Sequence, residues 1–168
     1  MYADFAELYD EHVWDVYGYL AYRVADRAEA EDLTQLTFER ALRAWRRYDP
    51  RRASPRTWLL AIARNLVIDH FRRRRPEPVG DRLDPGTTPG PEADLGISPE
   101  LATALASLGA LEREVLALRF GGDLNGPEIA EQFDLSLANV QQIVSRALRK
   151  LRAELEGSAL APSVRRGA

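Results

Sequence analysis

Residues Arg56–Arg75 have the sequence RTWLLAIARNLVIDHFRRRR, an amphipathic pattern that runs directly into four consecutive arginines. At the period of a helix the apolar residues fall on one side and basic residues on the other. An apolar back would pack on a core, and a basic front would lie along a phosphate backbone. An ordinary solvated helical surface is the alternative interpretation. The predicted back comprises Leu59, Ile62, Leu66 and Val67, and the front comprises Arg64, Ile68 and Arg72 with Asn65 and Arg75 beside them.

Two further helices are predicted before this one. Apolar and aromatic residues recur at three- and four-residue steps over Phe5–Val24, as one face of a helix requires. A second helix begins near Ala28 and ends at DPRRASPR, whose prolines and aspartate favour a turn. Ser54 followed by Pro55 is typical of an N-cap and a first helical turn, so the third helix begins there. Residues 1–75 are therefore predicted to form one small helical module.

A second helical module is predicted after a change in composition. Residues 76–98 contain five prolines and four glycines without apolar periodicity, which is typical of a flexible linker. Helical periodicity resumes over 99–156, and a flexible tail is expected at 157–168. The expected fold is all-α, with two small helical domains joined by the linker.

The second module contains a helix-turn-helix pattern. A short helix from Pro127 to Phe133 is followed by a tight turn at Asp134 and Leu135 and by a long helix from about Leu137. Asp134 tolerates the left-handed backbone conformation of such a turn better than most residues. The predicted core of this pattern is Ile129, Ala130, Val140, Ile143, Leu148 and Leu151.

The start of the long helix has the residue types of a DNA recognition helix. Asn and Gln suit paired hydrogen bonds to adenine, and Arg and Lys suit phosphates. A helical hairpin with an ordinary polar face would show a similar pattern. The candidate base-edge residues are Ser136, Leu137, Ala138, Asn139, Gln141, Gln142 and Ser145, and the candidate phosphate contacts are Arg146, Arg149, Lys150 and Arg152.

Charge is strongly segregated along the N-terminal half. Ten acidic and two basic residues lie between Met1 and Glu39, whereas twelve arginines and two aspartates lie between Arg40 and Arg75. This asymmetry indicates one surface adapted to a polyanion and another adapted to a different partner. Trp45, Tyr48 and Trp58, near the loop between the second and third helices, either stack on unpaired bases or belong to the core.

Several classes of protein are disfavoured by composition. The chain contains no cysteine, which excludes disulfides and thiolate metal sites. Its two histidines have no metal-binding or catalytic spacing, and no glycine-rich phosphate loop follows a strand, so we expect no enzyme, cofactor or metal. The acidic N-terminus does not resemble a signal peptide, and no apolar stretch is long enough to span a membrane. We therefore expect a cytoplasmic protein without membrane insertion.

Three stretches together resemble the extracytoplasmic-function sigma factors of the sigma-70 family. They are AEAEDLTQLTFERALRAWRRYD, RTWLLAIARNLVIDHFRRRR and LEREVLALRFGGDLNGPEIAEQFDLSLANVQQIVSRALRKLR, and they are similar to conserved regions 2 and 4. The resemblance covers about Phe5 to Glu156. It implies a two-domain initiation factor without enzymatic activity, whose partners are core RNA polymerase (β′ clamp and β flap), promoter DNA and, in many members, an anti-sigma factor.

The resemblance also assigns roles to matching positions. It implies that Ser136–Arg149 read the promoter −35 element, although this helix has Gln141 and Ile143 where relatives commonly have basic residues. Contact with the β′ clamp is implied for Asp32, Leu33, Gln35 and Phe38, beside Leu36, which replaces a common glutamate. Melting and reading of the −10 element is implied for Tyr48, Arg51, Arg52, Arg56, Arg64 and Asn65, with Arg72 on the same basic front.

Two other functions fit the same patterns. One is an autonomous helix-turn-helix repressor or activator whose N-terminal module dimerises or senses a signal. The other is a scaffold protein that does not bind DNA. A sigma factor would show little specific duplex binding until polymerase is added, whereas an autonomous regulator would bind its duplex alone.

Overall fold

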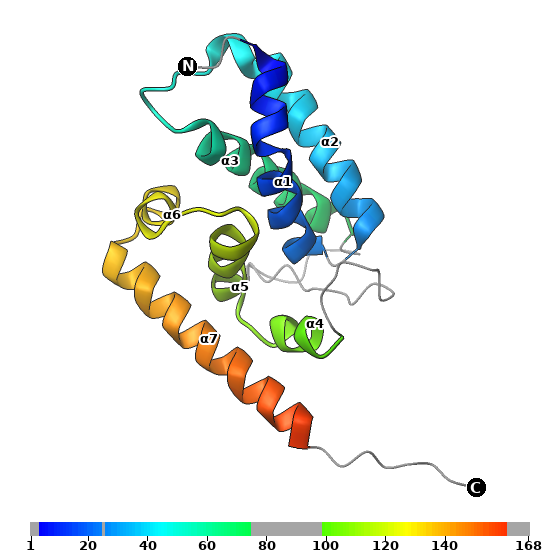
Figure 1. Ribbon diagram of the computed structural model, residues 1–168, viewed down its shortest axis with the longest axis vertical. Helices are drawn as coiled ribbons and strands as arrows, with labels where there is room; N and C mark the ends of the chain where they lie inside the picture. Colours follow the sequence, from blue (N-terminus) through cyan, green and yellow to red (C-terminus); the bar gives the residue numbers. More distant parts are fainter. Residues whose placement is uncertain (1–3, 25, 75–98, 161–168) are drawn as a thin grey trace, which may run out of the picture.

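The computed structural model describes residues 4–24, 26–74 and 99–160, and every regular element within these ranges is a helix (Figure 1). The predicted all-α fold is confirmed. The predicted linker at 76–98 lies outside the described residues. The N-terminal module comprises α1 (Phe5–Val24), α2 (Arg27–Ala44), the 3₁₀ helix η1 (Trp45–Arg47) and α3 (Pro55–Arg74). The C-terminal module comprises α4 (Pro99–Ala106), α5 (Ala110–Leu116), the π-helical segment η2 (Ala117–Gly121), α6 (Gly126–Phe133) and α7 (Leu137–Leu160).

The helix starts in the N-terminal module follow from local side-chain hydrogen bonds. The Asp26 carboxylate accepts the Glu29 N–H at 2.8 Å and caps α2. The Ser54 hydroxyl accepts the Thr57 N–H at 3.2 Å, so the predicted cap of α3 is confirmed. The bounds of α1 also match the prediction.

The helix-turn-helix pattern is confirmed in the C-terminal module. Asn125 and Glu128 cap α6 reciprocally. The Glu128 carboxylate accepts the Asn125 N–H at 2.8 Å, and the Asn125 side-chain oxygen accepts the Glu128 N–H at 3.0 Å. Asp134 adopts the left-handed conformation, with φ 53° and ψ 44°, and turns the chain into α7. Helix α7 continues to Leu160, so the beginning of the expected tail is helical.

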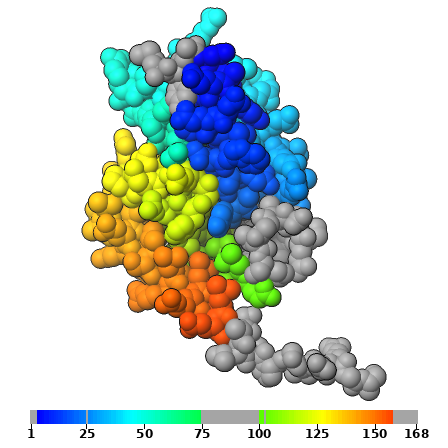
Figure 2. Space-filling view, in the orientation of Figure 1, coloured from blue at the N-terminus to red at the C-terminus, as the bar shows by residue number. Residues whose placement is uncertain are grey.

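The two modules share one hydrophobic core. Helix α1 lies against the C-terminal module, and the space-filling view shows no break between them on the visible face (Figure 2). The predicted arrangement of two small helical domains did not include this contact between them. The shared cluster includes Leu8, Val16 and Leu20 of α1, Leu60 and Val67 of α3, and Leu118, Leu124, Ile129 and Val140 of the C-terminal module.

Part of the predicted core is wrong. Leu148 is 43% exposed, and Ala147 is buried in its place. The buried stripe of α7 follows Val140, Ile143 and Ala147, and Leu148 lies one residue, or about 100°, beyond it. The prediction continued the apolar pattern to Leu148, but α7 contacts its neighbours along a narrower stripe.

Candidate functional site

A groove runs along α2 on the surface of the N-terminal module. Asp32 and Gln35 are exposed along it, whereas Leu33 and Phe38 are buried, with relative exposures of 7% and 5%. Of the four residues predicted to contact polymerase, Asp32 and Gln35 are therefore available at the surface and Leu33 belongs to the core. Phe38 borders the groove from beneath, where its ring packs on Phe5 and Tyr9. The groove is lined by Phe5, Asp32, Gln35, Leu36, Phe38, Glu39 and Leu42.

The loop before α3 carries the first residues predicted to contact the −10 element. Tyr48 stacks on Trp45 with ring centroids 5.5 Å apart and contacts Trp58 at 4.6 Å. Its hydroxyl donates to the Ala53 carbonyl oxygen at 2.9 Å. The three aromatic rings thus pack on one another, as the core alternative predicted. On the outer side of this loop, Arg51 is exposed and donates to Asp49; these hydrogen bonds hold the pKa of Asp49 below its ordinary value.

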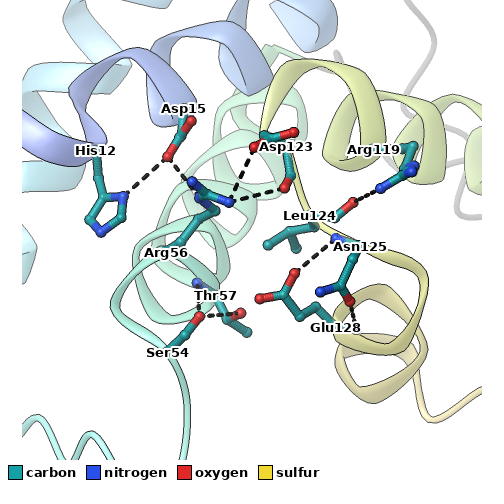
Figure 3. A network of polar contacts seen from close by, with 10 residues as sticks. All are labelled: His12, Asp15, Ser54, Arg56, Thr57, Arg119, Asp123, Leu124, Asn125 and Glu128. Atoms are coloured by element: carbon teal, nitrogen blue, oxygen red, sulfur yellow. Dashed lines mark hydrogen bonds and ion pairs between the residues drawn. The ribbon is translucent and has the colours of Figure 1, made fainter.

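Arg56 is engaged by acidic residues from both modules. Its Nε donates to Asp15 of α1 at 2.8 Å, and its Nη1 donates to the Asp123 carbonyl and carboxylate oxygens at 3.2 and 3.3 Å (Figure 3). Asp15 is also 3.1 Å from Nδ1 of the buried His12. One guanidinium therefore links α1, α3 and the turn that follows η2.

Arg64, about two turns further along α3, contacts the C-terminal module. Its Nε is 3.6 Å from Oε1 of Glu114 in α5, and its guanidinium carbon lies 4.5 Å from the centre of the Phe133 ring. Only 32% of its side chain is exposed. The other predicted residues on this surface, Arg52, Asn65 and Arg72, are exposed.

Glu114 is the centre of a buried polar cluster between the modules. The Tyr19 hydroxyl donates to its Oε1 at 2.6 Å, and Arg23 Nε lies 2.8 Å from its Oε2. Tyr19 is fully buried, and Arg23 is 3% exposed. Burial, together with the negative charge of Glu114, raises the pKa of Tyr19 well above its ordinary value, so the phenol remains the donor. Buried charges of this kind are tolerated only when paired.

A second groove follows the outer face of α7. It is lined by Ala138, Gln141, Gln142, Ser145, Arg146 and Arg149, which are six of the residues predicted to contact the −35 element. Ser136 and Asn139 lie at the exposed start of the helix, where the Ser136 hydroxyl accepts the Asn139 N–H at 3.2 Å. Ile143 is buried, so its position cannot supply a phosphate contact in this arrangement.

Glu112 holds α7 against α5. Lys150 Nζ donates to both of its carboxylate oxygens at 3.0 and 2.8 Å, and Arg146 Nε lies 3.4 Å away. Burial raises the pKa of Glu112, but the hydrogen bonds from Lys150 and the Gly109 N–H and the charges of Lys150 and Arg146 outweigh it, so the pKa lies below the ordinary value of a glutamate. These contacts orient the α7 groove relative to the rest of the module.

Other kinds of site were sought in the same residues. No group of three or more His, Cys, Asp or Glu side chains placed to hold a metal ion occurs in the described part of the chain. Among the helices described, none combines the length and apolarity needed to cross a bilayer.

Sequence reasoning identified the cations of these surfaces but not their partners. Asp15, Glu114 and Asp123 were not predicted as functional residues. Glu114 carries one signal in the sequence, because it is part of a charged triplet within the apolar stretch around α5. The partners of Glu114 lie in the N-terminal module, 95 residues away along the chain in the case of Tyr19, and no local pattern encodes them.

The chain matches two family descriptions. Residues 8–77 match sigma-70 region 2, and residues 104–153 match sigma-70 region 4. It is 34% identical over 154 residues to the ECF RNA polymerase sigma factor BldN of Streptomyces coelicolor. The aligned region covers 88% of this chain and 58% of BldN. It is 32% identical over 152 residues to the ECF RNA polymerase sigma factor SigM of Bacillus subtilis. The aligned region covers 88% of this chain and 92% of SigM.

A solved structure is also similar along most of the chain. CnrH, in a complex with the cytosolic domain of CnrY, superposes with a TM-score of 0.68 at 27% identity, covering 91% of this chain and 88% of CnrH. The chain belongs to the sigma-70 family and is an ECF RNA polymerase sigma factor, a class that acts in transcription initiation.

Proposed function

We propose that this sigma factor binds core RNA polymerase through the α2 groove, at the β′ clamp, and directs it to promoters with −10 and −35 elements. The two exposed polar residues of the groove, Asp32 and Gln35, supply hydrogen-bond acceptors and donors, and Leu36 and Leu42 supply apolar surface. A polar rim beside apolar side chains is a common composition for a protein interface. The C-terminal module makes a second polymerase contact, at the β flap.

The −35 element is assigned to the α7 groove. The observation that carries this assignment is that six residues predicted from the sequence to face DNA line one continuous groove on one helix. Gln141 and Gln142 offer paired hydrogen bonds to base edges, and Arg149 offers a phosphate contact. The −10 element is assigned to the loop before α3 and to the basic front of α3, from Tyr48 to Arg72.

An association assay with core polymerase tests the polymerase contact. The double variant Asp32→Ala, Gln35→Ala should weaken co-purification with core enzyme at least tenfold. Glu31→Ala is the matched control, because Glu31 is exposed on the same helix but outside the groove and pairs with Arg27 of the same helix. Failure of the unmodified protein to bind core polymerase would contradict the proposed function.

A mobility-shift assay with and without core polymerase separates this function from that of an autonomous regulator. Specific duplex binding should require the polymerase. In vitro transcription with core enzyme on genomic fragments then identifies the promoters. Binding to a specific duplex that is unchanged by polymerase would favour the autonomous regulator.

Three further features follow from this proposal. The chain has no catalytic activity of its own and works in the cytoplasm, where its polymerase is. An anti-sigma factor is an expected partner, because CnrH was solved in a complex with a second protein, the cytosolic domain of CnrY.

A further inference from the structure

The loop between η1 and α3 pairs one of its arginines with an aspartate of the same loop. Nε of Arg51 donates to Oδ1 of Asp49, and Nη2 donates to Oδ2, both at 3.0 Å. Two parallel hydrogen bonds between a guanidinium and a carboxylate fix the plane of the guanidinium. The Asp49 side chain is 30% exposed and that of Arg51 is 88% exposed. Because an exposed ion pair adds little to stability, its orientation matters for what the arginine can bind.

The backbone of the loop holds the Asp49 carboxylate in place. The Arg51 N–H donates to Oδ1 of Asp49 at 3.0 Å, which is the hydrogen bond of an Asx turn. The Arg52 N–H donates to the Asp49 carbonyl oxygen, also at 3.0 Å, and closes a β-turn. The Tyr48 hydroxyl ties the start of the loop to its end by donating to the Ala53 carbonyl oxygen at 2.9 Å. The turn therefore orients the carboxylate that receives the guanidinium.

The pairing changes what Arg51 offers to a nucleic acid. The carboxylate offsets the positive charge, so the pair attracts a phosphate less than a separate guanidinium does. The edge of the guanidinium that carries Nε and Nη2 is occupied by Asp49. The donors that remain are the two N–H groups of Nη1 and the second N–H of Nη2. They form one outer edge, which matches two acceptor atoms that lie side by side on a base.

We propose that Asp49 is a positioning residue that converts Arg51 from a phosphate contact into a reader of an unstacked base with two adjacent acceptors. Guanine has such a pair in O6 and N7, and unpaired cytosine has one in O2 and N3. Adenine and thymine have no two adjacent acceptors on one edge. The proposal rests on the assignment of this loop to the −10 element. It adds a role for Asp49 and names the class of base.

Arg52 provides a comparison on the same turn. Its side chain is exposed, and its charge contributes to lowering the pKa of Asp49. The side-chain hydrogen bonds of the Asp49 carboxylate are nevertheless those from Arg51. We therefore expect Arg52 to contact a phosphate, and Arg51 to contact a base.

The test uses variants that change the pair and keep the turn. Asp49→Asn removes the negative charge, but its amide oxygen still accepts the Arg51 N–H of the Asx turn. Arg51→Lys keeps the positive charge and lacks the paired donors of the guanidinium. Glu31→Gln is the matched control, because it removes one negative charge from an exposed ion pair of the same module, with Arg27, outside both surfaces assigned to DNA.

Base preference is measured with the full chain bound to core polymerase. The probe is a labelled single strand of the −10 region of a promoter identified by in vitro transcription, in which each position in turn carries A, C, G or T. In the parent, one position should prefer guanine or cytosine to adenine and thymine by about tenfold. This preference should be lost in Asp49→Asn and Arg51→Lys and retained in Glu31→Gln. A parent without such a position, or a preference retained in Asp49→Asn, would overturn the proposal.

Salt dependence separates this positioning role from a purely structural one. Asp49→Asn frees the Arg51 charge for a phosphate, so the slope of log affinity against log salt should steepen by about 0.7. Strands without the preferred base should then bind more tightly at low salt. Weaker binding of every strand with an unchanged slope would mean that Asp49 only shapes the loop, and the proposal would be wrong. Failure of the parent complex to bind any −10 strand would overturn the proposed function instead.

Discussion

The basic front of α3 and the outer groove of α7 are both assigned to promoter DNA but differ in what surrounds them. Arg56 is bound by Asp15 of α1 and Asp123 of the C-terminal module, and Arg64 lies against Glu114, whereas the glutamines of the α7 groove face solvent. The difference teaches that residue type alone does not make a DNA surface. Whether a cation is free to bind phosphate depends on which acidic side chains the fold brings to it.

The largest effect is expected from removing the buried charge that engages α3. Glu114→Ala leaves Arg23 buried without a counter-charge, so the free energy of unfolding should fall by about 3–5 kcal/mol. Urea unfolding at neutral pH measures it. Glu39→Ala, which breaks an exposed pair with Arg43, should cost less than about 1 kcal/mol. Equal losses in the two variants would show that the Glu114 cluster is not a buried one.

Substitutions in the α7 groove should change promoter binding rather than the free energy of unfolding. Gln142→Ala should reduce discrimination at one −35 base pair by about 1–3 kcal/mol. The measurement is competition between promoter duplexes for the polymerase complex. Arg152→Ala, on the same helix but outside the groove, should leave base discrimination unchanged. A Gln142 variant that still distinguishes every base pair as well as the parent does would exclude this side chain from base contacts.

Acid should loosen α7 through Glu112. Its pKa in the folded state lies below the ordinary value of a glutamate, so its contribution to stability is complete above that ordinary value and is lost as pH falls through the folded-state pKa. A decrease of about 1 kcal/mol is expected, because Lys150 is half exposed. Urea midpoints measured between pH 6 and about pH 3 should fall more steeply for the parent than for Glu112→Gln. Parallel curves would mean that Glu112 does not contribute this dependence.

The smallest effect on stability is expected at two aspartates that have the same backbone conformation. Asp123 and Asp134 both have φ 53°, where glycine is less strained, so glycine at either position should relieve a similar cost of up to about 1 kcal/mol. Only Asp123→Gly also removes the carboxylate that binds Arg56, an exposed contact of about 0.2–1 kcal/mol. Asp134→Gly should therefore be the more stable variant in thermal unfolding. The reverse order would mean that Asp123 does not restrain Arg56 in solution.

Most of the local structure could be predicted because local interactions determine it. The bounds of α1, the Ser54 cap and the left-handed Asp134 each depend on residues within a few positions along the chain. The α7 groove was predictable for the same reason, since one helical period places its residues together.

The joining of the modules could not be predicted in this way. Leu118 and Leu124 pack in the same core as α1, and Glu114 meets Tyr19, but each module alone has a plausible helical pattern without these contacts. The proline-rich composition between them indicated a flexible linker and predicted no contact between the modules. Contacts between distant segments depend on the complementary shape of two surfaces, as at Gly18 and Gly121, and a single sequence does not display that shape.

The π-helical turn at Ala117–Gly121 determines which atoms meet α1. The Gly122 N–H donates to the Ala117 carbonyl oxygen at 2.9 Å, a five-residue step that accommodates one residue more than an α-helical turn. Deleting a single residue there would rotate the following chain by about 100°. A side chain, rather than the bare glycine backbone, would then meet α1. The packing of the C-terminal module on α1 thus depends on the rotation that this single π-helical turn gives to the chain after it.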